Sequence, residues 1–321
     1  MKNSKKLLWG ILGAGEIADQ FLASFPDNID GEVAAIASRS LSKARLLATK
    51  YNVPTFYGNY KELIHNFELD IIYIATINHV HFDQAKMCLL AGKAVLCEKP
   101  LTIEYQKTQE LIKIAKENNL FLMEAIRTPF LPHITKLKEI LEKQNTDIIK
   151  VGQLNFGFNK NPNTERLFNT KFGGGALFDM GVYGISTIIY LFGYPSEIHA
   201  VSNKSKENEV DSFTTIIFKY RCGRIIKMSF SICFDLPLHF ILLGSDISIQ
   251  IFNKWWREPS LQLRMVKQIK NFEFDSFTNF SAHMINHVSE CIKSGKKESN
   301  ILSFNKTLET AKITNEIFTK I

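Results

Sequence analysis

The chain has 321 residues, of which 45% are hydrophobic and 22% are charged, values typical of a globular protein large enough for two domains. Its formal net charge of +7 comes from basic residues scattered along the chain, with short clusters only at Lys2/Lys5/Lys6 and Lys293/Lys296/Lys297. A nucleic-acid surface needs a denser basic stripe with aromatic residues between the charges, so we expect no nucleic-acid partner.

The five cysteines are too sparse and irregular for a disulfide framework or a thiolate metal site, and their odd number favours a reducing compartment. The basic N-terminus and the apolar run at 7–12 imitate a signal peptide, but Glu16 and Asp19 follow where the cleavage site would lie. No run approaches the length of a membrane span. We therefore expect a cytoplasmic protein that does not bind a membrane.

Strand-like and helical segments alternate from Leu7 to about Glu124. Strands are expected at 8–12, 33–38, 55–57, 71–75, 94–97 and 121–124. Helices are expected between them, at 16–25, 42–51, 60–66, 81–90 and 102–118. This alternation predicts a doubly wound parallel sheet, in an N-terminal domain over residues 1–124.

A glycine-rich turn joins the first expected strand to the first helix. The segment Gly13–Ala18 has the pattern G-x-G-x-x-A, in which the first glycine makes the tight turn and the second lets the backbone approach a pyrophosphate. The helix N-terminus attracts the phosphate charge. In this strand–turn–helix context the pattern predicts a dinucleotide-binding Rossmann domain. The cofactor-binding residues predicted here are Gly13, Ala14, Gly15, Glu16 and Ile17.

The end of the second strand indicates which dinucleotide is bound. An acidic residue there contacts the free ribose 2′-hydroxyl of NAD, whereas an arginine accommodates the 2′-phosphate of NADP. The chain has Ser38, Arg39 and, one turn later, Lys43, with no carboxylate among them. We predict NADP, held in part by these three residues.

Polar residues also follow the fourth strand. Thr76 and Asn78 could line the nicotinamide ribose, and we place His81 in the same group of cofactor-binding residues. His79 and His81 lack a third donor at ligand spacing, so no metal is expected.

The fifth strand ends in Glu98-Lys99-Pro100. Ligands of open α/β sheets bind beyond the carboxyl ends of the strands, so this turn directs the amine of Lys99 towards the ligand crevice. Pro100 stiffens the turn and follows either a trans or a cis bond. We therefore predict that Glu98 and Lys99 contact the cofactor and that Lys99 also takes part in catalysis.

The pattern changes after Glu124. Long strand-like runs at 151–159, 213–220, 225–234 and 240–252 predict an open, mainly antiparallel sheet with helices on one face, in a second domain over residues 125–321. In the third run the apolar residues alternate with Lys227, Ser229, Ser231 and Cys233. This polar but thinly charged face fits either a solvated sheet or the interface of a homodimer or higher homo-oligomer.

One helix of the second half is apolar almost all round. It follows Gly173-Gly174-Gly175 and runs from Ala176 to Phe192, so it is expected to be buried. Asp179 and Tyr183 are four residues apart and share one of its faces. A buried carboxylate needs a cation or several donors, and Lys99 is such a cation. We predict that Asp179 and Tyr183 are catalytic.

These motifs together resemble the glucose–fructose oxidoreductase/inositol dehydrogenase (Gfo/Idh/MocA) family over nearly the whole chain. The residues that carry the resemblance are Gly13–Ala18, Tyr57–Tyr60, Ile74–Thr76, His81, Glu98–Pro100, Met123–Ala125 and Gly173–Asp179. Tyr183, where many members have histidine, is similar to the dihydrodiol dehydrogenase-like branch. The resemblance implies that Tyr183 is the proton donor and that the cofactor is NADP. Arg127 stands where this branch usually has an aromatic residue, which is a departure in the substrate pocket.

The hypothesis that follows is a reversible hydride transfer between NADP(H) and a secondary alcohol or carbonyl of a sugar, polyol or cyclic diol. Tyr183 would exchange the hydroxyl proton, Lys99 would bind the same oxygen, and Asp179 would hold Lys99 or a substrate hydroxyl. Two alternatives stay open: an inactive NADP-binding sensor or regulator of the same fold, and a different reductase chemistry such as tetrapyrrole reduction.

Overall fold

The computed structural model describes residues 6–27, 29–66, 68–205, 209–257, 260–274 and 281–321. The chain divides into two compact units, the first within 1–127 and 278–308 and the second within 128–277 and 309–321. We predicted two uninterrupted domains that meet at residue 124. The difference arises because Phe304 is part of the first unit's core, and because the N–H of Leu122 donates to the carbonyl of Lys297.

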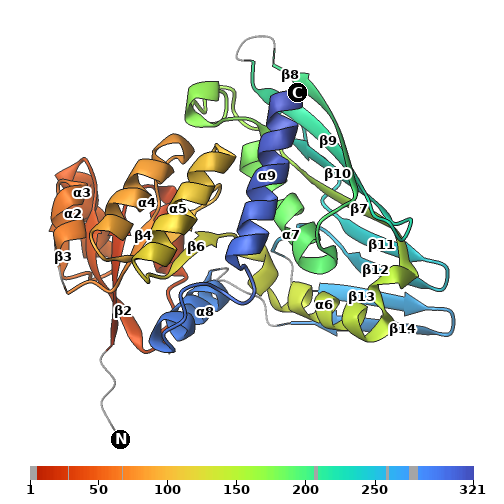
Figure 1. The fold of residues 1–321 in the computed structure, drawn as a ribbon, viewed down its shortest axis with the longest axis horizontal. Helices are drawn as coiled ribbons and strands as arrows, with labels where there is room; N and C mark the ends of the chain where they lie inside the picture. Colours follow the sequence, from red (N-terminus) through yellow and green to blue (C-terminus); the bar gives the residue numbers. More distant parts are fainter. Residues whose placement is uncertain (1–5, 28, 67, 206–208, 258–259, 275–280) are drawn as a thin grey trace, which may run out of the picture. The chain divides into compact units, whose positions relative to one another are not determined.

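The first unit contains a six-stranded sheet in the order β3-β2-β1-β4-β5-β6, and every pair is parallel. Its strands are β1 (Leu7–Leu12), β2 (Gly31–Ala37), β3 (Thr55–Tyr57), β4 (Ile71–Ile74), β5 (Ala94–Glu98) and β6 (Leu122–Ala125). Its helices are α1 (Glu16–Ala23), α2 (Leu41–Lys50), α3 (Tyr60–His65), α4 (His81–Leu90), α5 (Tyr105–Glu117) and α8 (Ala282–Lys293). In Figure 1, α4 and α5 lie side by side over the sheet. The prediction of a doubly wound Rossmann sheet is confirmed.

The core of this unit explains the apolar runs of the sequence. All four residues of β4 are buried, as are Ala94–Cys97 of β5, because helices cover both faces of a parallel sheet. The strands end together at their carboxyl edge, where β1, β2 and β4 lie side by side. This edge positions the loops that begin at Gly13, Ser38 and Ala75 next to one another.

The second unit contains an eight-stranded sheet in the order β14-β13-β12-β11-β7-β10-β9-β8, antiparallel except for the pair β7–β10. Its strands are β7 (Ile149–Gly157), β8 (Glu197–Lys204), β9 (Asp211–Lys219), β10 (Ile225–Ser231), β11 (Phe240–Gly244), β12 (Ile247–Ile251), β13 (Ser260–Met265) and β14 (Gln268–Glu273). Helices α6 (Pro132–Gln144) and α7 (Val182–Phe192) lie on one side of the sheet in Figure 1. Helix α9 (Phe304–Lys320) crosses the last unit boundary. The predicted open, mainly antiparallel sheet is confirmed.

Two elements of this unit differ from the prediction. The run 240–252, expected as one strand, is the hairpin β11–β12, in which Phe240 pairs with Ile251. The turn residues between the two strands are Ser245 and Asp246. The helix expected from Ala176 begins instead with a π-helical turn over Leu177–Gly181 and continues as α7. π-Helical turns are rare and occur frequently at functional sites.

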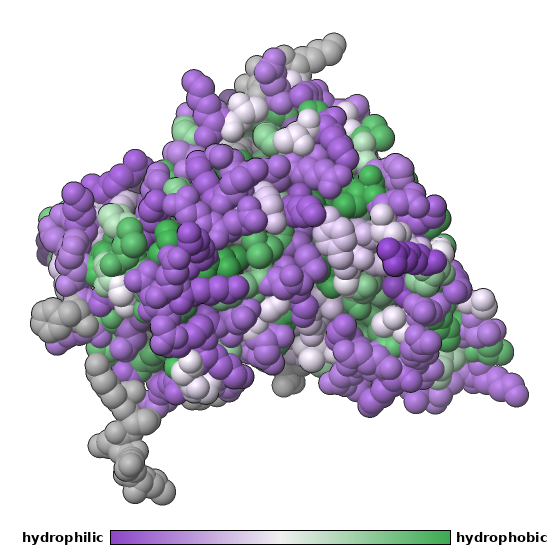
Figure 2. All heavy atoms as spheres, viewed as in Figure 1, coloured by the Kyte–Doolittle hydropathy of each residue, from purple (hydrophilic) through white to green (hydrophobic). Residues whose placement is uncertain are grey.

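The segment Thr170–Phe192 is long and apolar enough to cross a membrane, but 83% of its most apolar window is buried inside the protein. It is therefore the core helix of the second unit, as its uniformly apolar sequence predicted. Figure 2 shows that hydrophilic side chains predominate on the face drawn, with smaller hydrophobic areas between them.

Candidate functional site

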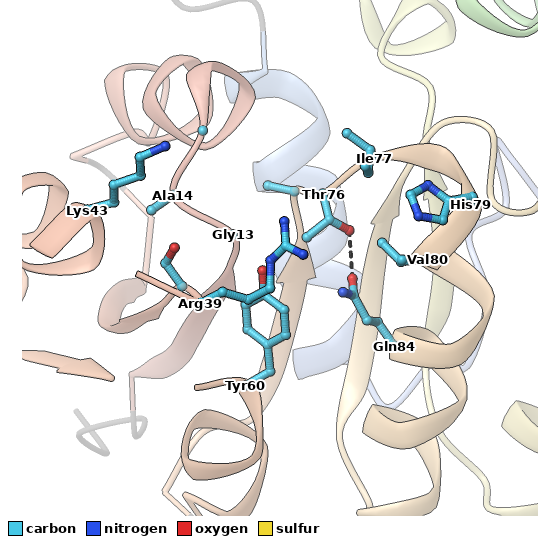
Figure 3. A pocket seen from close by; sticks show the side chains of 13 residues that line it. Gly13, Ala14, Arg39, Lys43, Tyr60, Thr76, Ile77, His79, Val80 and Gln84 are labelled. Carbon is cyan, nitrogen blue, oxygen red and sulfur yellow. Dashed lines mark hydrogen bonds between the residues drawn. The ribbon is translucent and has the colours of Figure 1, made fainter. Parts of the chain in front are cut away.

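A cavity of about 290 Å³ lies at the carboxyl edge of the first unit's sheet. Its lining comes from the loops after β1, β2 and β4, from the first turns of α2 and α4 and from the first residue of α3 (Figure 3). The lining residues are Gly13, Ala14, Gly15, Ser38, Arg39, Lys43, Tyr60, Ala75, Thr76, Ile77, His79, Val80 and Gln84. Seven of the predicted cofactor-binding residues are thus brought together around one cavity: Gly13, Ala14, Gly15, Ser38, Arg39, Lys43 and Thr76.

Gly13 and Gly15 leave room for a ligand in different ways. Gly13 has a φ of +115°, and a Cβ there would lie 2.5 Å from the carbonyl oxygen of Ala75. A Cβ at Gly15 would meet nothing within 4 Å, so this side of the turn is open. Gly15 precedes α1, whose N-terminus receives no hydrogen bond from a capping side chain. Backbone N–H groups and the helix dipole there suit a phosphate.

The side of the cavity beyond β2 is basic. Arg39 and Lys43 are exposed and both line the cavity, and none of its lining residues is acidic. The hydroxyl of Ser40 accepts the N–H of Lys43 at 3.4 Å and so caps α2, while the hydroxyl of Ser38 accepts the N–H of Ser40 at 3.2 Å. These bonds fix the backbone that carries Arg39. A group with negative charge is favoured on this side.

Several lining residues were not predicted from the sequence. Figure 3 shows Tyr60 beside Arg39. It also shows the hydrogen bond that the hydroxyl of Thr76 donates to the side-chain oxygen of Gln84. The distance between these two oxygens is 2.6 Å. Gln84 lies one turn inside α4, directly after the polar segment that follows β4, so its position was a usable signal. Tyr60 begins α3, and its approach to the cavity depends on how α3 packs against β2 and β3, which spacing alone does not reveal.

Other predicted residues lie outside this lining. Glu16 is exposed and accepts a hydrogen bond from Gln20, and Ile17 is exposed as well. Asn78 begins a 3₁₀ turn over Asn78–Val80. The hydroxyl of Tyr73 donates a hydrogen bond to the carboxylate of Glu98, at an oxygen–oxygen distance of 2.5 Å. Their direct contact with a cofactor stays a prediction.

His81 has a different place from the one expected. It is fully buried, with Nδ1 2.8 Å from the carbonyl oxygen of Pro100 and Nε2 3.2 Å from that of Thr76. Burial lowers its pKa, so the ring is neutral and donates to one of these carbonyls at a time. His81 therefore supports the loops beneath the cavity instead of lining it.

Lys99 is half-buried directly after β5, and the Lys99–Pro100 bond is cis. This is one of the two geometries expected for the turn. Beside it, Glu124 at the end of β6 is buried and accepts the N–H of Leu101 at 2.9 Å. The sequence analysis identified Glu124 only as part of the motif Met123–Ala125.

In the second unit, Tyr183 lies against aromatic side chains. Its exposed fraction is 8%, and its ring centroid is 6.0 Å from that of Phe156. Phe156 stacks on Trp256 with centroids 3.8 Å apart, and Phe158 meets the edge of Trp256. Aromatic faces of this kind suit the apolar faces of a sugar or a cyclic diol. The sequence did not identify this group, because its members are brought together from β7, α7 and the segment after β12.

Asp179 has a cationic partner inside its own unit. Its Oδ1 lies 3.2 Å from Nη1 of Arg166, and the side-chain exposed fraction is 15% for Asp179 and 49% for Arg166. The sequence analysis did not identify Arg166. The predicted contact of Asp179 with Lys99 or with a substrate hydroxyl stays a prediction.

Two of the three glycines before this helix have a steric reason. A Cβ on Gly174 would lie 2.4 Å from the carbonyl oxygen of Leu167. Gly175 has a φ of +108°, and a Cβ there would lie 1.9 Å from Oδ1 of Asp211. The other carboxylate oxygen of Asp211 accepts the N–H of Leu177 at 2.7 Å. A buried carboxylate from β9 therefore caps the helix that carries Asp179 and Tyr183.

Comparisons with known proteins agree with this architecture. Residues 7–126 match the model of an oxidoreductase family with an NAD-binding Rossmann fold (GFO_IDH_MocA), and residues 134–250 match the GFO/IDH/MocA C-terminal domain. The trans-1,2-dihydrobenzene-1,2-diol dehydrogenase of Xenopus tropicalis is 33% identical over 96% of each chain. The mouse enzyme of that name is 33% identical over 97% of this chain and 95% of its own.

Solved structures show the same fold. The 3-ketoreductase KijD10 from Actinomadura kijaniata, in complex with NADP and TDP-benzene, has a TM-score of 0.87 at 22% identity, over 98% of this chain and 97% of its own. A levoglucosan dehydrogenase in complex with NADH and levoglucosan has a TM-score of 0.85 at 18% identity, over 98% of this chain and 96% of its own. The named cofactor thus differs between two proteins with this fold.

Proposed function

Because the chain belongs to the Gfo/Idh/MocA family of oxidoreductases, we propose that it is an NADP-dependent dehydrogenase acting on CH–OH groups. It would transfer a hydride between NADP(H) and a secondary alcohol or carbonyl of a sugar, polyol or cyclic diol. The dihydrodiol dehydrogenases, similar over the full chain length, support this class of substrate. The aromatic side chains beside Tyr183 support it as well, because they offer apolar faces next to a hydroxyl.

The residues around the first unit's cavity fit a dinucleotide. The open side of Gly15 and the start of α1 would hold the pyrophosphate, and Gly13 lets the loop pass close to Ala75. Arg39 and Lys43 would bind the 2′-phosphate that distinguishes NADP from NAD. When bound, the nicotinamide ring supplies the hydride chemistry, and the protein positions it.

We propose that Tyr183 is the residue that exchanges a proton with the substrate oxygen. Its phenol would give a proton to the carbonyl oxygen during reduction or take the hydroxyl proton during oxidation. Lys99 would donate a hydrogen bond to the same oxygen, and its positive charge would favour the tyrosine anion. Asp179, held by Arg166, would accept a hydrogen bond from a further substrate hydroxyl.

The observation that carries the proposal is the meeting of Gly13, Gly15, Arg39, Lys43 and Thr76 around one cavity at the carboxyl edge of a parallel sheet. This edge is where open α/β sheets bind their ligands.

The direct test is an assay of NADPH formation or consumption with a panel of aldoses, polyols and cyclic trans-diols, run in parallel with NADP and NAD. We expect turnover with at least one CH–OH compound and a higher kcat/KM with NADP. Tight NADPH binding without turnover of any compound would favour the sensor. A large spectral change with a tetrapyrrole would favour the other reductase chemistry.

We also propose a homo-oligomer, most simply a dimer, formed through the open face of the second unit's sheet. Val201, Ile217, Val151 and Leu243 are exposed on four strands of this sheet, with exposed fractions of 74%, 39%, 48% and 43%. Exposed apolar side chains on a thinly charged sheet face favour association. Light scattering at micromolar concentration should give at least twice the mass of the chain; a monomer would contradict this proposal.

The expected cytoplasmic location stays a proposal. The five cysteines all lie in the part of the chain that the structure describes, and all are free thiols, which supports a reducing compartment.

A further inference from the structure

Gln84 is a buried polar side chain on the wall of the first unit's cavity. Its exposed fraction is 8%, and it lines the cavity from the first turn of α4. Its side-chain oxygen accepts a hydrogen bond from the hydroxyl of Thr76 at 2.6 Å. The amide nitrogen has no hydrogen-bond partner in the part of the chain that the structure describes. A buried donor of this kind costs free energy unless a ligand or a water molecule accepts from it.

The bond from Thr76 determines which end of the amide is available to a ligand. A threonine hydroxyl has one proton to donate, and here the oxygen of Gln84 receives it. The nitrogen is therefore the end that stays available. In Figure 3 it lies on the side of the amide that faces Arg39 and Tyr60, which also line the cavity. The wall after β4 thus presents an oriented donor to the cavity.

The positions of the anionic groups indicate which part of a dinucleotide would meet this donor. The proposed function places the pyrophosphate at Gly15 and the 2′-phosphate at Arg39 and Lys43. In NADP the 2′-phosphate and the 5′-linked pyrophosphate are attached to one ribose, and the adenine base is attached to the same ribose. The base would therefore occupy the part of the cavity that these residues leave.

The remaining wall of the cavity suits a flat heterocycle. Its aromatic and apolar side chains are Tyr60, Ala75, Ile77 and Val80. Such side chains suit the faces of a base, whereas the edge of a base requires hydrogen-bond partners. Adenine has ring nitrogens that accept hydrogen bonds, among them N3 and N7. The amide nitrogen of Gln84 is a donor of the kind that these ring nitrogens require.

We propose that Gln84 is a specificity-determining residue, whose amide nitrogen donates a hydrogen bond to a ring nitrogen of the adenine base. Thr76 is then the positioning residue that holds the amide in this direction. The inference rests on the proposed binding of NADP, but it does not depend on hydride transfer. The two proposals can therefore be tested separately.

The first experiment measures the Kd of adenosine 2′,5′-bisphosphate and of reduced nicotinamide mononucleotide, the two halves of NADPH, by isothermal titration calorimetry. Gln84→Met keeps the length of the side chain but removes the donor. We expect this variant to bind the adenosine half about 2- to 12-fold more weakly, the range for one neutral hydrogen bond. Its Kd for the nicotinamide half should equal that of the wild-type chain.

The matched control is Gln106→Met, the same substitution at an exposed glutamine of α5 in the same unit. It should leave the Kd of both halves unchanged. An unchanged Kd of the adenosine half in Gln84→Met would overturn the proposal. Equal weakening of both halves would overturn it as well, because it would mean that the substitution disturbs the cavity as a whole.

The role of Thr76 is tested by Thr76→Val, which removes the hydrogen bond that orients the amide. The variant should bind the adenosine half more weakly than the wild-type chain. In the double variant with Gln84→Met, Thr76→Val should add no further loss, because the amide that it orients is already absent. Losses that add in the double variant would contradict the positioning role.

A measurement on the wild-type chain keeps the proposal testable if Gln84→Met does not fold. The side-chain amide signals of Gln84 can be followed by NMR in the chain labelled with 15N-glutamine. On addition of adenosine 2′,5′-bisphosphate, one of the two amide protons should shift downfield, as expected for a new hydrogen bond in the plane of the base. Reduced nicotinamide mononucleotide should leave it in place. An amide signal that the adenosine half does not move would overturn the proposal.

Turnover then separates the inference from the proposed dehydrogenase function. Binding of the adenosine half that depends on Gln84, in a chain that turns over no CH–OH compound, would leave the inference standing and remove the dehydrogenase function. Turnover with the same Kd for the adenosine half in the wild-type chain and in Gln84→Met would do the opposite. A chain that binds neither half of NADPH would remove both.

Discussion

Arg39 is the residue on which our proposal of NADP over NAD depends. It lines the cavity at the end of β2, where the hydroxyls of Ser38 and Ser40 fix the backbone around it. Its place could be predicted because the carboxyl end of the second strand of a doubly wound sheet always faces the cofactor ribose. The strength of the preference for NADP depends on where the exposed side chain of Arg39 points, which residue spacing does not reveal.

We expect Arg39→Asp to invert the cofactor preference. The variant loses a charge-assisted contact to the 2′-phosphate and gains an acceptor for the free 2′-hydroxyl. A contact of this kind is worth about 1.5–3 kcal/mol, so kcat/KM for NADP should fall roughly 10- to 150-fold.

The control is Arg45→Asp, an exposed arginine of the following helix α2 that does not line the cavity. It should keep the wild-type ratio of kcat/KM for NADP to that for NAD. Equal losses in both variants would mean that general charge, and not the site at Arg39, attracts the cofactor.

At the scale of the element, the start of the helix with Asp179 and Tyr183 depends on a carboxylate from β9. Asp211 accepts hydrogen bonds from the N–H of Leu177 at 2.7 Å and from the hydroxyl of Thr214 at 2.8 Å. Its other oxygen is buried against Gly175 and has no hydrogen-bond partner among the residues that the structure describes. The sequence predicted a buried helix after three glycines, but it could not identify Asp211, which lies 34 residues away from Leu177.

Asp211 makes stability depend on pH in a definite direction. Burial raises its pKa from 3.8 to about 6, against the smaller effects of Thr214 and the N–H of Leu177. The folded chain therefore binds this proton more tightly than the unfolded chain. Stability is reduced above pH 6 and is regained as the pH falls from 6 towards 4.

Asp211→Asn should remove this dependence. Relative to the variant, the free energy of unfolding of the wild-type chain should rise by roughly 2.5 kcal/mol between pH 7.5 and pH 4, measured by urea denaturation. Asp246→Asn, at an exposed position in the β11–β12 turn, should follow the wild-type curve. Parallel curves for Asp211→Asn and the wild type would contradict the assigned role.

At the scale of the whole molecule, the order of the first unit's strands followed from the alternation of apolar runs, because right-handed crossovers leave few alternatives. The boundary between the two units did not follow from this alternation. Residues 278–308 return to the first unit because apolar residues such as Phe304 enter its core, and packing of this kind is decided in space and not by chain order. The β11–β12 turn did have a signal, since Gly244, Ser245 and Asp246 are typical turn residues.

The site was predictable where it depends on chain topology and was missed where it depends on loops. Topology brings Gly13, Arg39 and Thr76 to one edge, and the sequence identified all three. Arg166 lies in an irregular segment with no periodicity, so its ion pair with Asp179 had no signal in the sequence. The aromatic group of Phe156, Phe158 and Trp256 was likewise hidden in residues that read as ordinary core.

The central claim is that Tyr183 and Lys99 act on one substrate oxygen during hydride transfer, and single-turnover measurement of NADPH oxidation in Tyr183→Phe and Lys99→Ala tests it most directly. Each variant should lose about 10²- to 10⁴-fold in the rate of the chemical step while the Kd for NADPH stays at the wild-type value. The control Tyr190→Phe, on the same helix, should keep the wild-type rate. A rate near that of the wild type in either Tyr183→Phe or Lys99→Ala would contradict the claim.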